Sequence, residues 1–484
     1  MKKIKFISSE LIILVIFLFL VFLYLIKGNF YFKSTIKIIL GIIIILPFLF
    51  TKNFLKNIAL FFPIFLCTGI RYVLEHKFLV PKTPPVVPLF LHFTDFLAFI
   101  IFFYFIINYL TLRKLNQDPF FRHFLVFFLS LFLSLIFSYD KVFSLFHILM
   151  FFDSYIIYRF ILNNLEEDKN NNIKTFIFAY LIFLIFNIFI GLIQLVFGYV
   201  PFMGKEFMEI HGFEIKRIRG VFVHGNSFGG ILALTIPCFL SFYFSKSFKN
   251  SSIRIKIVYF FFLFILFFTL FFTYSRNSLI SCIVGILSFL LIYFWKIKKI
   301  NLFLKYFLLL STFLLFFIFL SKFTFEKVYE RILSIFRIQE DISFQIRLYY
   351  WKNSLRTFLK YPFFGIGISQ FIYMPYAFFV IIPHNLYIQL LLETGIFGFL
   401  SFIFLIGSII KSLFLCVKKV DLNEKYSWMP IGLIGSWFAF LNHNLLDSSW
   451  TTINHNEEMK IFFIMITLSV FIYKKLYLNK TSIK

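Results

Sequence analysis

Long apolar runs alternate with short polar segments along almost the whole chain. Most runs approach or exceed the roughly 20 residues that a helix needs to cross the hydrocarbon core of a bilayer. We therefore predict an all-α, polytopic transmembrane bundle. Losing one pair among the weakest runs, at 35–50, 54–70 and within 122–162, leaves twelve spans in place of fourteen. The predicted spans are 9–26, 35–50, 54–70, 89–110, 122–138, 141–162, 174–198, 226–246, 255–273, 277–295, 301–320, 386–415, 428–447 and 459–477.

The composition agrees with a protein surrounded by lipid. Of the 484 residues, 61% are hydrophobic and only 14% are charged, which is too little polar surface for a water-soluble fold. The net charge of +26 is spread over short loops, so anionic membrane lipids are its expected partners and nucleic acid is not. The four cysteines form no disulfide or zinc pattern. We expect a single integral membrane domain over residues 1–484, with an uncleaved first span.

The distribution of Lys and Arg predicts the orientation. Basic residues concentrate in alternate short loops, which places both termini in the cytoplasm. Two longer segments on the other side, 199–225 and 321–385, are also basic, but long loops are translocated regardless of their charge. Their basicity is therefore free to serve a function. The Pro- and Gly-rich stretches 80–88 and 361–371 are typical of loops.

Within the 321–385 segment, the stretch RLYYWKNSLRTFLK (347–360) predicts an amphipathic helix. Such a helix is expected to lie at the membrane interface, with its apolar side in lipid and its cations at the level of the phosphates. The apolar side carries Leu348, Trp351, Leu355 and Leu359, and the cationic stripe carries Lys352, Arg356 and Lys360.

The predicted topology gathers several unusual side chains at the external ends of spans. Arginine presents a planar fork that matches a phosphate or a diphosphate, so a cluster of arginines favours an anion between them. A single interfacial arginine can instead anchor a span to the headgroups. Arg276 stands out because it is the lone cation in a short external turn. The candidates are Arg217, Arg219, Arg276, Arg347 and the pair His384-Asn385.

The stretch RIRGVFVHGNSFGG (217–230) surrounds Asn226 with glycines where a span begins. Close backbone approach and a helix N-terminus both favour bound anions. The alternative is a flexible loop followed by a helix cap.

His384 begins the span 386–415 on the external side. An imidazole can accept a proton from a sugar hydroxyl near neutral pH, which makes His384 a candidate general base. Asn385 can either cap the helix or hold the imidazole tautomer. Among the other histidines, which we interpret as structural, His224 and His443 have the most similar contexts.

Few ionisable groups lie inside the spans. Asp95, Asp153 and Glu393 are the clearest, and we interpret Asp95 and Asp153 as locally hydrogen-bonded groups. The external loops offer no acidic pair placed to hold a divalent ion against a diphosphate, so we predict no metal and no cofactor.

Four motifs in order resemble the O-antigen ligase/polymerase superfamily of bacterial membrane glycosyltransferases. They are Arg217-x-x-Gly220 before Asn226, TYSRNSLI around Arg276, the stretch from Arg347 through PFFGIG, and His384-Asn385 followed after nine residues by Gly395-Ile-Phe-Gly398. The resemblance covers a core of about residues 210–415. Two features depart from it: Phe-Val-His-Gly-Asn replaces Gly-Asn-Pro-Asn before the span at 226–246, and fourteen spans replace the usual twelve.

The resemblance implies a metal-independent, inverting glycosyl transfer from an undecaprenyl-diphosphate-linked glycan. Arg217 and Arg276 would bind the diphosphate, and Arg219 is an alternative candidate for the role of Arg217. His384 would activate the acceptor hydroxyl. Asn226, Arg347 and Asn385 are further substrate-binding candidates.

The leading hypothesis is a ligase of the bacterial inner membrane that acts at the periplasmic face on lipid A-core. A polymerase that uses a second lipid-linked glycan as acceptor is the nearest alternative, and the higher span count favours it. A protein O-glycosylating enzyme comes third. A transporter or flippase is more remote, because the notable cations cluster on one face.

Overall fold

The computed structural model describes residues 54–68, 71–77, 86–92, 94–95, 97–102, 118–167, 171–197, 199–200, 204–205, 207–210, 213–222, 224–308, 311–312, 342–377, 382–448 and 456–478. The spans predicted at 9–26 and 35–50 lie outside these residues, as do parts of those at 89–110 and 301–320.

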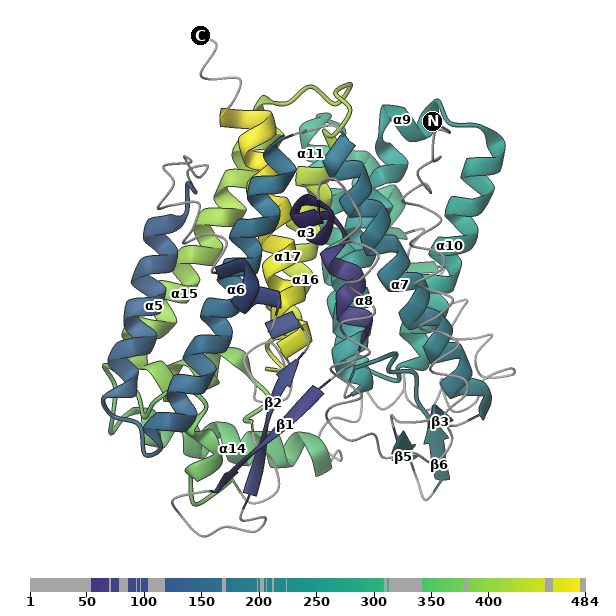
Figure 1. The fold of residues 1–484 in the computed structure, drawn as a ribbon. Helices are drawn as coiled ribbons and strands as arrows, with labels where there is room; N and C mark the ends of the chain where they lie inside the picture. The colour runs from purple at the N-terminus through teal and green to yellow at the C-terminus, as the bar shows by residue number, and fades with distance from the viewer. Residues whose placement is uncertain are drawn as a thin grey trace, which may run out of the picture.

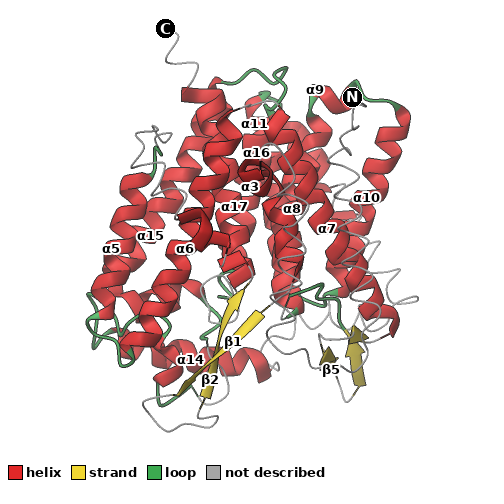
Figure 2. Cartoon of the chain, viewed as in Figure 1, coloured by secondary structure: helices red, strands yellow, loops and turns green. Residues whose placement is uncertain are grey.

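Helices dominate the described part of the chain (Figures 1 and 2). Within it, seven helices are long and apolar enough to cross a membrane, which confirms an all-α, multi-pass membrane protein. They are α6 (Lys141–Glu167), α7 (Asn171–Phe197), α8 (Gly225–Ser241) with η2 (Phe242–Phe244), α10 (Ile253–Phe272), α11 (Arg276–Lys296), α15 (Leu386–Lys419), and α17 (Asn456–Tyr473) with η6 (Lys474–Leu478). Shorter helices are α3 (Phe54–Phe65), continued by η1 (Leu66–Thr68), α5 (Phe121–Leu135), α9 (Lys246–Lys249) and α16 (Trp428–His443).

Short antiparallel hairpins join the helices. Strand β1 (Arg71–Lys77) pairs with β2 (Val86–His92), in a register that runs from Arg71 opposite His92 to Lys77 opposite Val86. Strand β2 therefore includes the first residues of the span predicted at 89–110. It also includes the last residues of the loop predicted at 80–88. The first error arises because an apolar run alone does not distinguish a strand from a helix. The second arises because the loop was predicted from its prolines, although Pro88 pairs with Glu75 within the hairpin. Two smaller pairs are β3 (Tyr199–Val200) with β4 (Gly204–Lys205) and β5 (Phe207–Ile210) with β6 (Phe213–Lys216).

The elements of the two long predicted external segments lie at one end of the bundle. In Figure 1, α14 (Ile342–Phe358), the β1–β2 hairpin and the β5–β6 hairpin lie together below the long helices, while α9 and the start of α10 lie at the opposite end. We call the first of these the site end. The loop predicted at 361–371 is a run of turns that leads into η4 (Gln370–Tyr373).

Helix α15 is broken near its site end. Gly395 takes φ +66 and interrupts the helix, and the turns that follow α14 enter the break. The Ile366 N–H donates to the Leu392 carbonyl oxygen (3.0 Å), and the Ile396 N–H donates to the Pro362 carbonyl oxygen (2.8 Å). Backbone groups that the kink leaves without helical partners are thus satisfied by the loop.

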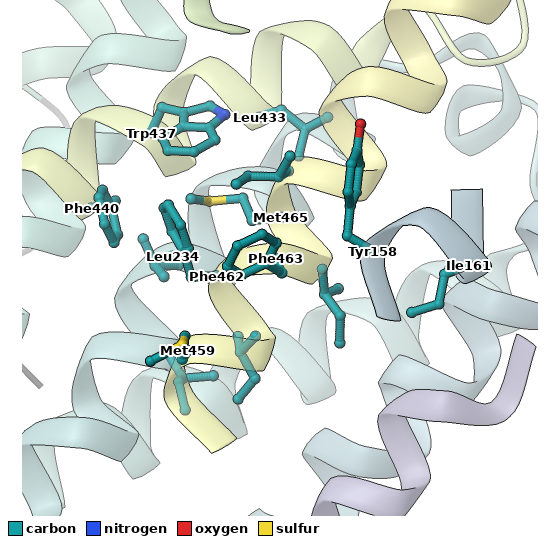
Figure 3. Close-up of a cluster of buried hydrophobic side chains, with 14 of the residues drawn as sticks. Tyr158, Ile161, Leu234, Leu433, Trp437, Phe440, Met459, Phe462, Phe463 and Met465 are labelled. Atoms are coloured by element: carbon teal, nitrogen blue, oxygen red, sulfur yellow. The ribbon is translucent and has the colours of Figure 1, made fainter. Parts of the chain in front are cut away.

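The interior of the bundle is packed with aromatic and aliphatic side chains. Figure 3 shows Trp437 and Phe440 of α16 beside Phe462 and Phe463 of α17. The Trp437 Nε1–H donates to Ser469 Oγ at 3.0 Å, so the buried indole has a polar partner as well as an apolar surrounding. These contacts fix α16 against α17.

Three charged side chains form one cluster inside the bundle, which we call the inner cluster. Lys460 of α17 is 1% exposed and pairs with Asp95 and with Asp153 of α6, the latter at 3.2 Å between Nζ and Oδ2. The expectation that Asp95 and Asp153 are isolated, locally bonded acids is therefore wrong. The partner was not recognised because Lys460 lies far away in the sequence.

Candidate active site

Two buried amides of α7 hold the segment that follows β6. Gln194 Oε1 accepts hydrogen bonds from the backbone N–H groups of Arg219 (2.9 Å) and Gly220 (3.1 Å). Asn187 Oδ1 accepts a third from the Val221 N–H (3.0 Å). Gly220 turns the chain with φ +59, a conformation that glycine adopts without strain. Sequence reasoning missed both amides, whose signal is a polar side chain inside an apolar helix.

Arg217 is oriented by two hydrogen bonds. Its Nε–H donates to the Thr273 carbonyl oxygen (2.9 Å), and Nη2 donates to Asn226 Oδ1 (3.0 Å). Asn226 is therefore a partner of Arg217 and not the cap of α8, since the N-cap residue is His224. The half-buried guanidinium thus joins the start of α8 to the end of α10.

Arg276 is the first residue of α11 and is half-buried. The preceding residue, Ser275, caps the helix with its hydroxyl, which accepts from the Ser278 N–H. Because Arg217 bonds the carbonyl of Thr273, it is tied to the chain only three residues before Arg276. The two predicted diphosphate-binding arginines therefore sit on directly linked segments.

His384 occupies the turn before α15 in a left-handed backbone conformation, φ +55. That conformation is unfavourable for a residue with a Cβ and often marks functional sites. Asn385 fixes the turn: its Oδ1 accepts from the N–H groups of Tyr387 and Ile388, and its Nδ2 donates to the Leu445 carbonyl oxygen. Of the two roles left open for Asn385, the structure shows the helix cap.

A carboxylate that sequence reasoning missed faces His384. The distance from His384 Nδ1 to Asp447 Oδ1 is 3.9 Å, and the Asp447 carbonyl oxygen accepts from the Leu386 N–H. Asp447 is 4% exposed, whereas the His384 side chain is 27% exposed. The imidazole is therefore open on one side and faces a buried acid on the other. The only sequence signal was an acid at the last residue of the predicted span 428–447.

Arg347 completes the surroundings of this pair. Burial raises the pKa of the Asp447 carboxyl, but His384, His443 and Arg347 outweigh burial and hold that pKa below its ordinary value. The positive charge of Arg347 thus acts on the same carboxylate as the imidazole. On the same helix, the Trp351 Nε1–H donates to the carbonyl oxygen of Pro383, directly before His384. We call His384, Asp447 and Arg347 the outer cluster.

Helix α14 differs in part from its prediction. Leu348, Leu355 and Leu359 are exposed, as are the cations of the stripe, which fits an interfacial helix. Trp351 is half-buried and bonded to the segment of His384 instead of facing lipid.

Hydrogen bonds through His443 link the arginine-bearing segments to the end of α16. The Asn277 amide of α11 donates to the His443 carbonyl oxygen (2.6 Å), and Ser278 Oγ lies 3.2 Å from His443 Nε2. Asp447 follows four residues later in the chain. Arg276 and Asp447 are therefore connected through one short chain of bonds.

Within the described ranges, no group of three or more His, Cys, Asp or Glu side chains is placed to hold a metal ion. The site end combines arginines with an imidazole that faces a buried carboxylate. These groups are suited to an anion and to proton transfer.

Residues 261–403 match the family model Wzy_C, described as O-antigen ligase. Over these residues the chain is similar to the O-antigen ligase family. The match lies inside the predicted core of 210–415 and contains Arg276, Arg347 and His384. It supports the resemblance to the O-antigen ligase/polymerase superfamily and, with the membrane-spanning helices, favours a membrane enzyme of the glycosyltransferase type. Among curated proteins, none matches the sequence.

Proposed function

We propose that this protein transfers a glycan from an undecaprenyl-diphosphate carrier to a hydroxyl of lipid A-core, at the periplasmic face of the bacterial inner membrane. One observation carries the proposal. A half-exposed histidine faces a buried carboxylate, at the same end of the bundle as two linked arginine-bearing segments. This combination supplies a base and a site for an anionic leaving group.

In the proposed reaction, His384 accepts the proton of the acceptor hydroxyl through Nε2, while Nδ1 faces Asp447. The acceptor oxygen forms a bond to the anomeric carbon, and the bond from that carbon to the diphosphate oxygen breaks. The electron pair stays on the diphosphate. Asp447 stabilises the imidazolium that forms, and its gap of 3.9 Å is of the kind that closes when substrate binds.

Arg217 and Arg276 stabilise the charge that develops on the leaving diphosphate. Fixed cations lower the barrier when they bind the transition state more strongly than the ground state. The two hydrogen bonds of Arg217 orient its planar fork before substrate arrives. Arg219 and Arg347 bind further anionic groups of the substrates, and Asn226 and Asn385 act by orienting Arg217 and His384. The reaction as proposed needs no metal.

The decisive experiment replaces His384 with Ala and measures glycan transfer in membranes supplied with lipid-linked donor. We expect a loss of about 10² to 10⁴-fold, the usual contribution of a general base. His123→Ala is the matched control, because His123 lies in the first turn of α5, at the opposite end of the bundle. Normal transfer by a normally expressed His384→Ala protein overturns the proposal.

The acceptor is tested separately in a strain that lacks the protein. Free lipid-linked polymer together with bare core is the expected result for a ligase. Core capped with a single repeat shows instead a polymerase that uses a second lipid-linked glycan. The proposed orientation predicts that reporters fused at residues 299 and 340 lie on opposite sides of the membrane, and signals from the same side contradict it.

A further inference from the structure

His443 is a second histidine near the site, and the proposed reaction does not use it. It is the last residue of α16 and is 1% exposed, so it is closed to substrate. Its Nε2 lies 3.2 Å from Ser278 Oγ, and the Ser278 hydroxyl donates to Ser275 Oγ at 2.7 Å. Since the one hydroxyl proton of Ser278 is used toward Ser275, Ser278 accepts from the Nε2–H of His443.

This chain of bonds ends at the residue that caps α11. Ser275 Oγ accepts from the Ser278 N–H, and the residue after Ser275 is Arg276. The Asn277 amide adds a second tie, because it donates to the His443 carbonyl oxygen at 2.6 Å. The ring and the backbone of His443 thus both hold the first turn of α11.

The imidazole also packs against a third helix. A Cβ added to Gly230 of α8 would lie 2.9 Å from Cε1 and 3.0 Å from Nε2 of His443. Only glycine allows this approach without displacing the ring. Gly230 lies about one turn after Asn226, the partner of Arg217.

Three helix ends that carry site residues therefore meet at one imidazole. α8 carries Asn226, α11 carries Arg276, and the chain leaving α16 reaches Asp447 four residues after His443. A phenylalanine of similar size fills the same space but donates no hydrogen bond to Ser278.

We propose that His443 is a positioning residue for glycosyl transfer, which sets the placement of Arg276 relative to the His384–Asp447 pair through Ser278 and Ser275. The proposal rests on the proposed function. It assigns a role to a buried side chain that does not contact substrate.

The test compares His443→Phe with His443→Gln, which keeps an N–H donor near the position of Nε2. We expect His443→Phe to lower kcat by about 10-fold to 100-fold with little change in KM, because small misplacements of catalytic groups have effects of that size. His443→Gln should retain most of the rate. Equal rates for the two variants, or a full rate for His443→Phe, overturn the proposal.

A double-mutant cycle separates positioning from packing. In an Arg276→Ala background, His443→Phe should cause little further loss, because its effect acts through Arg276. Independent losses that multiply contradict the proposed path. If His443→Phe does not fold, Ser278→Ala removes the same link without changing the ring, and the same cycle applies to it.

Failure of this inference is distinguishable from failure of the proposed function. If His384→Ala and Arg276→Ala both retain transfer, the proposed function fails whatever His443 does. If both lose transfer while His443→Phe and Ser278→Ala remain normal, only the positioning role fails.

Discussion

The protein contains two charged clusters that are built in opposite ways. In the inner cluster, Lys460 is 1% exposed and contacts two carboxylates directly. In the outer cluster, His384 is partly exposed and lies 3.9 Å from Asp447. The first cluster joins α17 to α6 and to Asp95 by direct contacts between one ammonium group and two carboxyl groups. In the second, the imidazole is partly exposed on one side, where a substrate can approach it.

Burial accounts for the difference. A charge removed from water is stable only when an opposite charge and hydrogen bonds replace its hydration. In the inner cluster, Lys460 supplies the opposite charge for both carboxyl groups, and its pair with Asp153 holds α6 and α17 together. At the site end, water or a ligand can reach the partly exposed imidazole. We therefore expect changes in the inner cluster to affect stability and changes in the outer cluster to affect transfer.

The largest effect should come from breaking the inner cluster. Lys460→Met leaves Asp95 and Asp153 buried without their cation, and removing one partner of a buried pair costs about 3–5 kcal/mol. Thermal unfolding in detergent should show a clearly lower Tm. A triple variant with Asn at both acids and Met at position 460 should recover much of the loss. An unchanged Tm for Lys460→Met would remove the contrast between the clusters.

Removing Arg217 should lower the rate of transfer and leave stability nearly unchanged, which is the opposite of the result expected for Lys460→Met. Arg217→Ala should lower transfer by about 10² to 10³-fold, as the loss of one preorganised charge-stabilising donor does, with a small change in Tm. Arg254→Ala is the matched control, because Arg254 is exposed on the first turn of α10. Transfer rates from lipid-linked donor measure both. A loss of stability without a specific loss of rate would place Arg217 with the structural charges.

Replacing the carboxylate of the outer cluster should have a smaller effect. Asp447→Asn preserves shape but removes the negative charge that faces His384. We expect transfer to fall by about 10-fold to 100-fold, less than for His384→Ala, because the base itself remains. The ratio of the two rates measures the contribution of Asp447. Equal rates for Asp447→Asn and the unchanged protein would exclude the pair as a catalytic unit.

The smallest effect is expected from the hydrogen bond that supports the outer cluster. Trp351→Phe removes the donor to the Pro383 carbonyl oxygen, and such a bond contributes about 1 kcal/mol. A rate loss of several-fold at unchanged Tm fits a role in holding the turn of His384. The reverse result, a lower Tm at an unchanged rate, assigns Trp351 to the stability of α14.

Features encoded in neighbouring residues were predicted well from sequence. The apolar runs predicted the long helices, and the ordered motifs around Arg276, Arg347 and His384 pointed to the family whose model matches residues 261–403. The sequence also predicted the helix at 347–360 from its periodicity.

Pairings between distant segments could not be predicted in the same way. Asp447 lies 63 residues after His384, and Lys460 lies 365 residues after Asp95, so no local pattern connects them. The amides Asn187 and Gln194 were concealed within an apolar helix. These contacts form only when the helices pack, and they determine which polar residues are structural and which remain open to substrate.

The break in α15 has a consequence for how the segment of His384 can change. Backbone hydrogen bonds join residue 362 to residue 396 and residue 366 to residue 392. The segment between residues 366 and 392 therefore begins and ends at the same place in the fold, and its two ends are fixed points. His384 lies between these points. A segment closed in this way has fewer conformations open to it than a free loop of the same length. The turn of His384 therefore loses less conformational entropy when a ligand fixes it in place.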